Sequence, residues 1–107
     1  MKSNINKRVV NGINIETEKY QEIDCNIIEV ETGTNCPKGG DNGHGGRTYL
    51  RIQDISATFI KITQLSNGNG VELELCGDSE CSTLIKALEF AVTKLKEQWE
   101  NNKIDNN

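Results

Sequence analysis

The sequence predicts an α+β fold in which an antiparallel sheet of about four to six strands is covered by one long C-terminal helix. Between residues 9 and 75, short stretches alternate apolar with polar side chains, as strands half buried on one face do. Segments rich in Gly and Asn separate these stretches. The only extended helical pattern follows them, so the strand–helix–strand alternation of doubly wound nucleotide-binding folds is missing.

The chain fits a single domain, residues 1–107, with a small core. Only 35% of its residues are hydrophobic, and its aromatic residues are two tyrosines, two phenylalanines and one tryptophan. Chains with so thin a core commonly gain burial by association, so we expect a homo-oligomer. The polar ends, residues 1–8 and 101–107, are expected to be loose.

The first half of the chain contains one hairpin signal and one clear strand pattern. Asn11-Gly12 lies between β-branched apolar residues, which predicts a tight hairpin turn. Residues 16–22 are charged and fit either an extended strand or a short helical turn. Residues 24–32 alternate, with Ile28 and Val30 on one face, and predict a strand.

Three further strands are predicted in the second half. Residues 47–53 alternate, and the face predicted to pack on the core carries Thr48, Leu50 and Ile52. Residues 58–65 and 71–75 form two more strands, joined by a turn rich in Gly and Asn. Residues 71–75 give the clearest strand pattern in the chain, with glutamates alternating with valine and leucine.

The C-terminal helix is predicted to begin at Asp78 or Ser79, because either side chain can accept hydrogen bonds from the first free amides. Phe90 falls near the side opposite the sheet, and its exposure in a monomer would be a second indication of a subunit contact. The stripe predicted to face the sheet consists of Leu84, Leu88, Ala91, Val92, Leu95 and Trp99.

Charge and composition exclude several functional classes. The formal net charge of −4 argues against a duplex nucleic-acid binder, which needs a clustered basic face. No apolar run approaches the roughly 18 residues that span a bilayer. The first residues lack the apolar core of a signal peptide, so a cytoplasmic location is predicted. The four cysteines lack zinc-knuckle spacing and are expected to be reduced thiols that pack in the fold, and no metal or cofactor is expected.

Residues 33–47 are expected to form a long loop around which the function is organised. They include six of the ten glycines and the only proline and histidine. Closely spaced glycines allow backbone N–H groups to approach an anion, and Arg47 adds a guanidinium fork suited to phosphate. The alternative is a mobile hairpin loop without a ligand.

The strand after this loop offers a second possible contact surface. Arg47, Tyr49 and Arg51 share the face opposite the one predicted to pack on the core. Two guanidiniums beside an aromatic ring suit the stacking of a base and the pairing of a phosphate. A solvated sheet face covered by long side chains is the alternative.

Catalysis is a competing hypothesis. His44, with Asp41 and Cys36, could provide a general base and a nucleophile. However, His44 stands between glycines that leave it free to rotate, whereas proton transfer needs a fixed geometry. Hydrogen bonding to a ligand or to the loop backbone is therefore favoured for His44 and Asp41, and no catalytic residue is predicted. A small enzyme acting on a phosphorylated nucleotide, or a structural oligomerisation module, remain the alternatives.

Residues 39–50, followed by strands and by Gly77-Asp78-Ser79-Glu80 at the start of a helix, resemble the first family of Thoeris anti-defence proteins of phages. The resemblance covers about residues 24–98. It implies a non-catalytic sponge that sequesters the cyclic ADP-ribose isomers made by a bacterial TIR enzyme, such as glycocyclic ADP-ribose. Some members of that family also trap cyclic oligonucleotides in a hexamer, so either a dimer or a hexamer is expected.

The resemblance also implies roles for particular residues. Arg47 would contact a phosphate or ribose, and Gly45 and Gly46 would let the backbone approach the ligand closely. Asp78 would accept a hydrogen bond from a ligand hydroxyl, and Lys94 would be a basic contact from the helix. Together with His44 and Asp41, these residues form the predicted ligand site.

Overall fold

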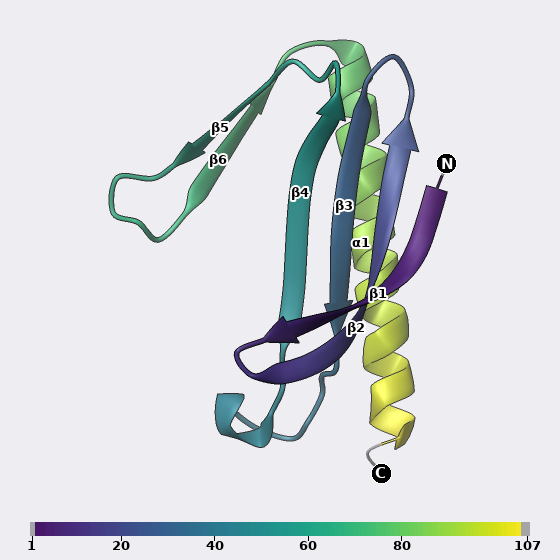
Figure 1. Cartoon of the computed structure of the whole chain (residues 1–107), viewed down its shortest axis with the longest axis vertical. Coiled ribbons are helices and arrows are strands. Elements are labelled where there is room, and N and C mark those ends of the chain that lie inside the picture. Colours follow the sequence, from purple (N-terminus) through teal and green to yellow (C-terminus); the bar gives the residue numbers. More distant parts are fainter. Residues whose placement is uncertain (1, 106–107) are drawn as a thin grey trace.

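The computed structural model describes residues 2–105 and confirms the α+β class (Figure 1). A four-stranded antiparallel sheet has the order β1-β2-β3-β4, and a separate hairpin pairs β5 with β6. One helix, α1 (Asp78–Asp105), follows the strands. The strands are β1 (Lys2–Val10), β2 (Ile13–Ile23), β3 (Ile27–Thr34), β4 (Thr48–Ser56), β5 (Ile60–Gln64) and β6 (Val71–Leu75).

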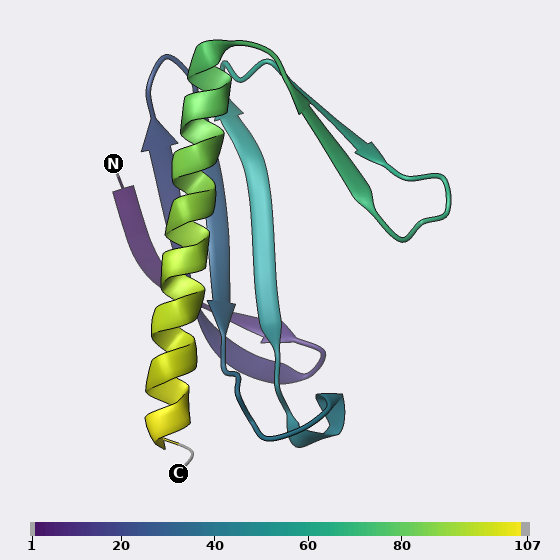
Figure 2. The ribbon, with the colours of Figure 1, turned by 180° about the vertical axis from the view of Figure 1, so that it is seen from behind.

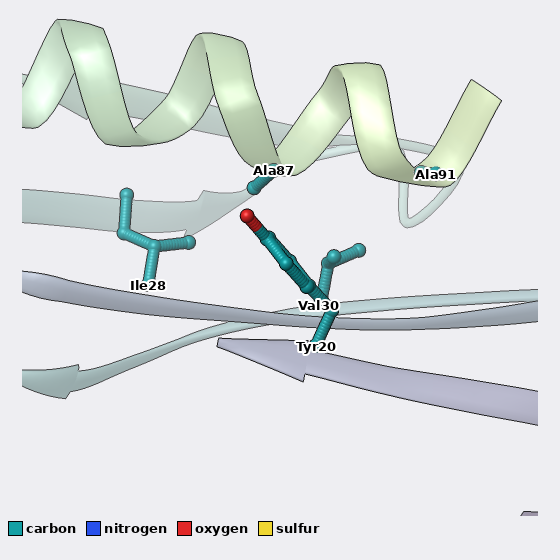
Figure 3. Packing of buried hydrophobic residues seen from close by; sticks show 5 residues of the cluster. All are labelled: Tyr20, Ile28, Val30, Ala87 and Ala91. Carbon is teal, nitrogen blue, oxygen red and sulfur yellow. The ribbon is translucent and has the colours of Figure 1, made fainter. Parts of the chain in front are cut away.

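Helix α1 lies along one face of the sheet, over β2 and β3 (Figures 1 and 2). The buried hydrophobic cluster between them consists of Tyr20, Ile28, Val30, Ala87 and Ala91 (Figure 3). The predicted exposure of Phe90 is wrong, because its ring stacks on Tyr20 with centroids 4.4 Å apart.

The predicted register of the helix is also wrong for half of the stripe. Ala91 is buried as expected, but Leu88, Val92 and Trp99 are 42%, 51% and 46% exposed. The helix approaches the sheet through Ala87, Ala91 and Gln98, with Leu84 and Phe90 packed against the buried cluster. Gln98 Oε1 accepts from the Thr34 amide at 2.8 Å, and its Nε2 donates to the Glu16 carbonyl at 3.0 Å. The most apolar stripe of the helix therefore faces away from the sheet.

The described residues at both chain ends belong to regular elements. Residues 2–8 belong to β1, which pairs with β2 from Lys2↔Gln21 to Val10↔Ile13. Residues 16–22, which fitted either a strand or a helical turn, lie within β2 and are therefore a strand. Residues 101–105 form the last part of α1. The predicted looseness of residues 1, 106 and 107 lies outside the described residues.

The hairpin of β1 and β2 curls over the face of the sheet opposite α1 (Figures 1 and 2). At the crossing, a Cβ atom at Gly33 would overlap the Glu16 carbonyl, so only glycine permits this close approach. Gly33 and Thr34 therefore belong to β3 rather than to the loop predicted there. The tip of the hairpin is brought beside the segment that joins β3 to β4 (Figure 1).

Candidate ligand-binding loop

Residues 35–47 connect β3 to β4 at the end of the molecule opposite the start of α1 (Figures 1 and 2). A short 3-10 helix, η1 (Asn42–His44), lies within this segment. Despite its many glycines, the loop is folded on itself by side chains that bond to its backbone.

Asn35 closes the loop. Its amide donates to the Arg47 carbonyl at 3.2 Å, and its Oδ1 accepts from the Arg47 amide at 2.7 Å. Its Nδ2 also donates to the Gly45 carbonyl at 3.0 Å. Sequence reasoning missed this residue, although an asparagine at the start of a loop is suited to bonding nearby backbone.

Arg47 joins the loop to the tip of the β1–β2 hairpin. Its Nε donates to the Val10 carbonyl at 3.1 Å, and Nη2 lies 3.4 Å from the Asn11 carbonyl. Its Nη1 donates to the carbonyls of Asn42 and Gly46 at 2.9 and 2.8 Å. Four of the five N–H bonds of a guanidinium are thus directed at protein carbonyls. Arg47 therefore positions the loop in this structure and is not a free fork.

Asp41 and His44 organise the turn at η1. Asp41 Oδ1 accepts from the Gly43 amide at 2.9 Å and lies 3.3 Å from His44 Nδ1. The His44 imidazole occupies the space that a side chain at residue 40 would need, which explains the glycine there. Asp41 thus bonds the loop backbone, as expected, whereas the His44 ring contacts the Asp41 carboxylate rather than the backbone. Both side chains are largely exposed.

The loop presents a run of unused backbone donors. Within residues 2–105, the N–H groups of residues 38–42 and of Gly46 donate to no protein acceptor. Residues 38–44 are exposed, and Lys38 makes no ion pair with a described residue. Successive backbone N–H groups hold anions in proteins where they converge, and the N–H groups of this exposed loop are open to a ligand. The loop therefore offers both donors and positive charge to a small anionic group.

The structure groups only part of the predicted ligand site. Asp41, His44, Gly45, Gly46 and Arg47 lie together in the loop.

The other two residues of the predicted site lie elsewhere in the protomer. Asp78 begins α1 at the opposite end of the molecule (Figure 2). Lys94 is directed at β2, where its Nζ lies 3.3 Å from Glu18 and 3.7 Å from Glu16, and its side chain is 11% exposed. Neither residue joins the loop within one protomer.

The predicted Arg–Tyr–Arg surface is covered by β1. The Arg8 guanidinium lies 5.2 Å from the centroid of the Tyr49 ring. Arg51 donates to Gln53 at 2.9 Å, and its Nη1 lies 3.9 Å from Glu31. Tyr49 and Arg51 therefore contribute to a polar network within the protein.

Glu31 is the centre of this network and is almost completely buried. Its carboxylate accepts from Arg8 Nε and Nη2 at 2.7 and 2.6 Å, and from Thr17 Oγ1 at 2.7 Å. The Arg8 hydrogen bonds lower the pKa of Glu31 to about 2, against the opposing effect of burial. The network ties β1, β2 and β3 together beneath the curled hairpin.

The cysteines differ from expectation. All four are free, as predicted, but Cys25, Cys76 and Cys81 are exposed and do not pack in the core. Within residues 2–105, no group of three or more His, Cys, Asp or Glu side chains is arranged to hold a metal ion. In the same part of the chain, no helix combines the length and apolar character needed to cross a membrane.

None of the protein-family models, curated proteins or solved structures compared with the chain matches it.

Proposed function

We propose that the chain is a non-catalytic binder that captures a small phosphorylated ligand on the backbone of residues 38–46. The observation that carries the proposal is the run of unused N–H groups in a loop held by Asn35 and Arg47. A loop that is already held loses less conformational entropy on capture, which favours tight binding. The nearby Lys38 and Arg47 provide positive charge in a chain whose net charge is −4. This combination favours one compact anion over a long polyanion.

The ligand class that we propose is a cyclic nucleotide immune signal, with glycocyclic ADP-ribose as the first candidate and cyclic oligonucleotides as the second. This choice rests on the resemblance of residues 39–50 to the Thoeris anti-defence proteins. In that role the chain would act in the cytoplasm of a host bacterium during phage infection. It would lower the free concentration of the signal without cleaving it.

The long contact between Asp41 and His44, and the exposure of both side chains, favour sequestration over catalysis. The two side chains approach only to 3.3 Å and are largely exposed. Within residues 2–105, no third side chain hydrogen-bonds this pair. A general base is normally held in place by a further group and shielded from water.

The experiment that tests this proposal incubates the protein with glycocyclic ADP-ribose, removes free ligand, heat-denatures the complex and analyses the supernatant by mass spectrometry. We expect stoichiometric release of the intact ligand and a higher melting temperature of the complex, because the ligand binds only the folded state. A changed product would establish catalysis instead. If neither glycocyclic ADP-ribose nor a cyclic oligonucleotide is retained, the proposal is wrong.

A variant pair locates the binding surface. Lys38→Ala removes a positive charge that makes no ion pair with a described residue, so the fold should be unaffected. We expect ligand affinity to fall by about fivefold, as for loss of an exposed charge contact worth up to about 1 kcal/mol. Lys61→Ala, on β5, also removes an exposed lysine and serves as the matched control. Equal effects of the two changes would place the ligand elsewhere.

A further inference from the structure

Helix α1 has a second apolar stripe on the side that faces away from the sheet. Its members recur at alternating steps of three and four residues, which is the heptad spacing of helices that pack against helices. The stripe spans about 21 Å at 1.5 Å per residue. It consists of Ile85, Leu88, Val92, Leu95 and Trp99, of which all but Leu95 are more than 40% exposed.

The surface of this stripe is uneven rather than flat. Two shallow hollows lie along it, one around Leu88 and Val92 and the other around Leu95 and Trp99. Side chains of a facing helix fill hollows of this kind when helices pack by knobs into holes. The remaining residues that line them are Ile85, Glu89, Thr93, Lys96 and Glu100.

Charges at the edges of the stripe indicate the orientation in which a second copy of α1 would pack on it. Glu89 and Lys96 lie one heptad apart along one edge, and neither makes an ion pair with a described residue. The other edge is turned toward the sheet and carries the uncharged residues Leu84, Ala91 and Gln98.

In an antiparallel pair of identical helices, like edges meet. Glu89 of one copy then faces Lys96 of the other, and the same contact occurs twice. In a parallel pair, the charged edge faces the uncharged one. The Glu89–Lys96 pairs therefore form only in the antiparallel orientation.

We propose that the exposed stripe of α1 is the interface of a homodimer in which the α1 helices of two copies pack antiparallel about a two-fold axis near Val92. Each copy buries the stripe against the other, and two Glu89–Lys96 pairs flank the contact. This interface is separate from the glycine-rich loop, so it stands or fails independently of ligand binding.

The first test measures the mass of the full chain by sedimentation equilibrium between about 5 and 100 μM, a range in which a micromolar complex dissociates. We expect a dimer, and we expect Leu88→Glu/Val92→Glu to be monomeric because charges replace the centre of the stripe. Since both side chains are exposed in the protomer, the circular dichroism spectrum should not change.

The matched control is Lys86→Glu, which changes the net charge by the same two units at an exposed position of α1 that lines neither hollow. It should remain dimeric. A monomeric unaltered chain, or a Leu88→Glu/Val92→Glu variant that keeps the assembly of the unaltered chain, would overturn the proposal.

The second test establishes the orientation. Glu89→Lys should weaken the dimer about fivefold to tenfold, because two exposed ion pairs become repulsive. Adding Lys96→Glu to the same chain should restore the affinity, since each pair is then rebuilt with its signs exchanged. If the double variant is as weak as or weaker than the single one, the antiparallel arrangement is wrong.

Discussion

The loop of residues 35–47 and the hairpin of β5 and β6 both project from the body of sheet and helix, but they are held in different ways. The loop is fixed by Asn35, Asp41 and Arg47, whose side chains bond to its backbone. The hairpin leaves the opposite end of the molecule and extends away from it (Figure 1). Apart from its base, where Leu75 packs against the core, it depends on its own backbone ladder.

The hairpin also leaves apolar surface uncovered. One of its faces carries Ile62 and Val71, which are 52% and 61% exposed. A two-stranded hairpin without further packing is only marginally stable in water. The segment with the clearest strand pattern thus has the least tertiary support, whereas the glycine-rich loop is well connected. A regular local pattern identifies an element but does not measure its stability.

The largest loss of stability is expected from Glu31→Gln, in the network beneath the hairpin tip to which the loop is bonded. The change leaves Arg8 without its charged partner beneath the hairpin tip to which the loop is bonded. We expect the free energy of unfolding in urea to fall by about 3–5 kcal/mol, as when a buried ion pair loses one member. Glu74→Gln, an exposed position on β6, is the control and should have little effect. Similar losses in the two variants would mean that the Glu31 network does not hold the hairpin.

Lowering the pH should reduce the stability of the fold through the same carboxylate, by slightly less than Glu31→Gln does. The folded-state pKa of Glu31, about 2, lies below the ordinary value of 4.5, so its ionised form stabilises the fold. That contribution is complete above about pH 4.5 and is lost as the pH falls toward 2, amounting to about 3 kcal/mol. Urea unfolding across this range should therefore show a steeper loss for the unaltered chain than for Glu31→Gln. Parallel pH profiles would contradict the assignment.

Arg47→Ala should act mainly on the loop. Removing the guanidinium removes one donor from each of four carbonyls, for which we expect a loss of about 1–3 kcal/mol. Hydrogen exchange at the Gly45 amide, which bonds to the Asn42 carbonyl, should become faster. Arg51→Ala removes a guanidinium from β4 that is not bonded to the loop and should leave that rate unchanged. If both variants accelerate exchange equally, Arg47 does not position the loop.

The smallest effect is expected in the hairpin of β5 and β6. Ile62→Ser removes an exposed apolar side chain, so the protomer should change in stability by less than about 0.5 kcal/mol. Val30→Ala, in the buried cluster, provides the contrast, with an expected loss of at least about 1 kcal/mol. Both changes are made in the monomeric Leu88→Glu/Val92→Glu variant, so that thermal unfolding measures the stability of the protomer without the dimer interface. If Ile62→Ser loses more than about 0.5 kcal/mol of stability, the hairpin is supported by packing within the protomer.

The elements that sequence patterns identified are those specified by neighbouring residues. Asn11-Gly12 marks a turn by its own backbone preferences. Helix α1 begins at Asp78, as expected, but the Ser79 hydroxyl donates to Asn26 Oδ1 in a distant part of the chain. Alternation likewise located β3, β4, β5 and β6, apart from their ends.

The features that were missed depend on residues far apart in the chain. The hydrogen bonds from Arg8 to Glu31 hold the polar strand β1 in the sheet. The hydrogen bond from the Thr34 amide to Gln98 holds α1 against β3. In the candidate site, the composition of residues 39–47 indicated a loop, but the connection from Arg47 to the hairpin tip was not visible in the sequence. Hydrophobic periodicity found a stripe of α1 in which Leu84 and Ala91 pack on the sheet side, whereas Leu88, Val92 and Trp99 are exposed.

The central claim is that the loop backbone holds the ligand, and amide chemical shifts test it most directly. A ¹H–¹⁵N NMR titration of the assigned chain with glycocyclic ADP-ribose should give saturable shifts that are largest at residues 38–42 and Gly46, where the protein leaves N–H groups without an acceptor. The amides of β5 and β6 should not move. Saturable shifts centred elsewhere, or none at millimolar ligand, would contradict the account.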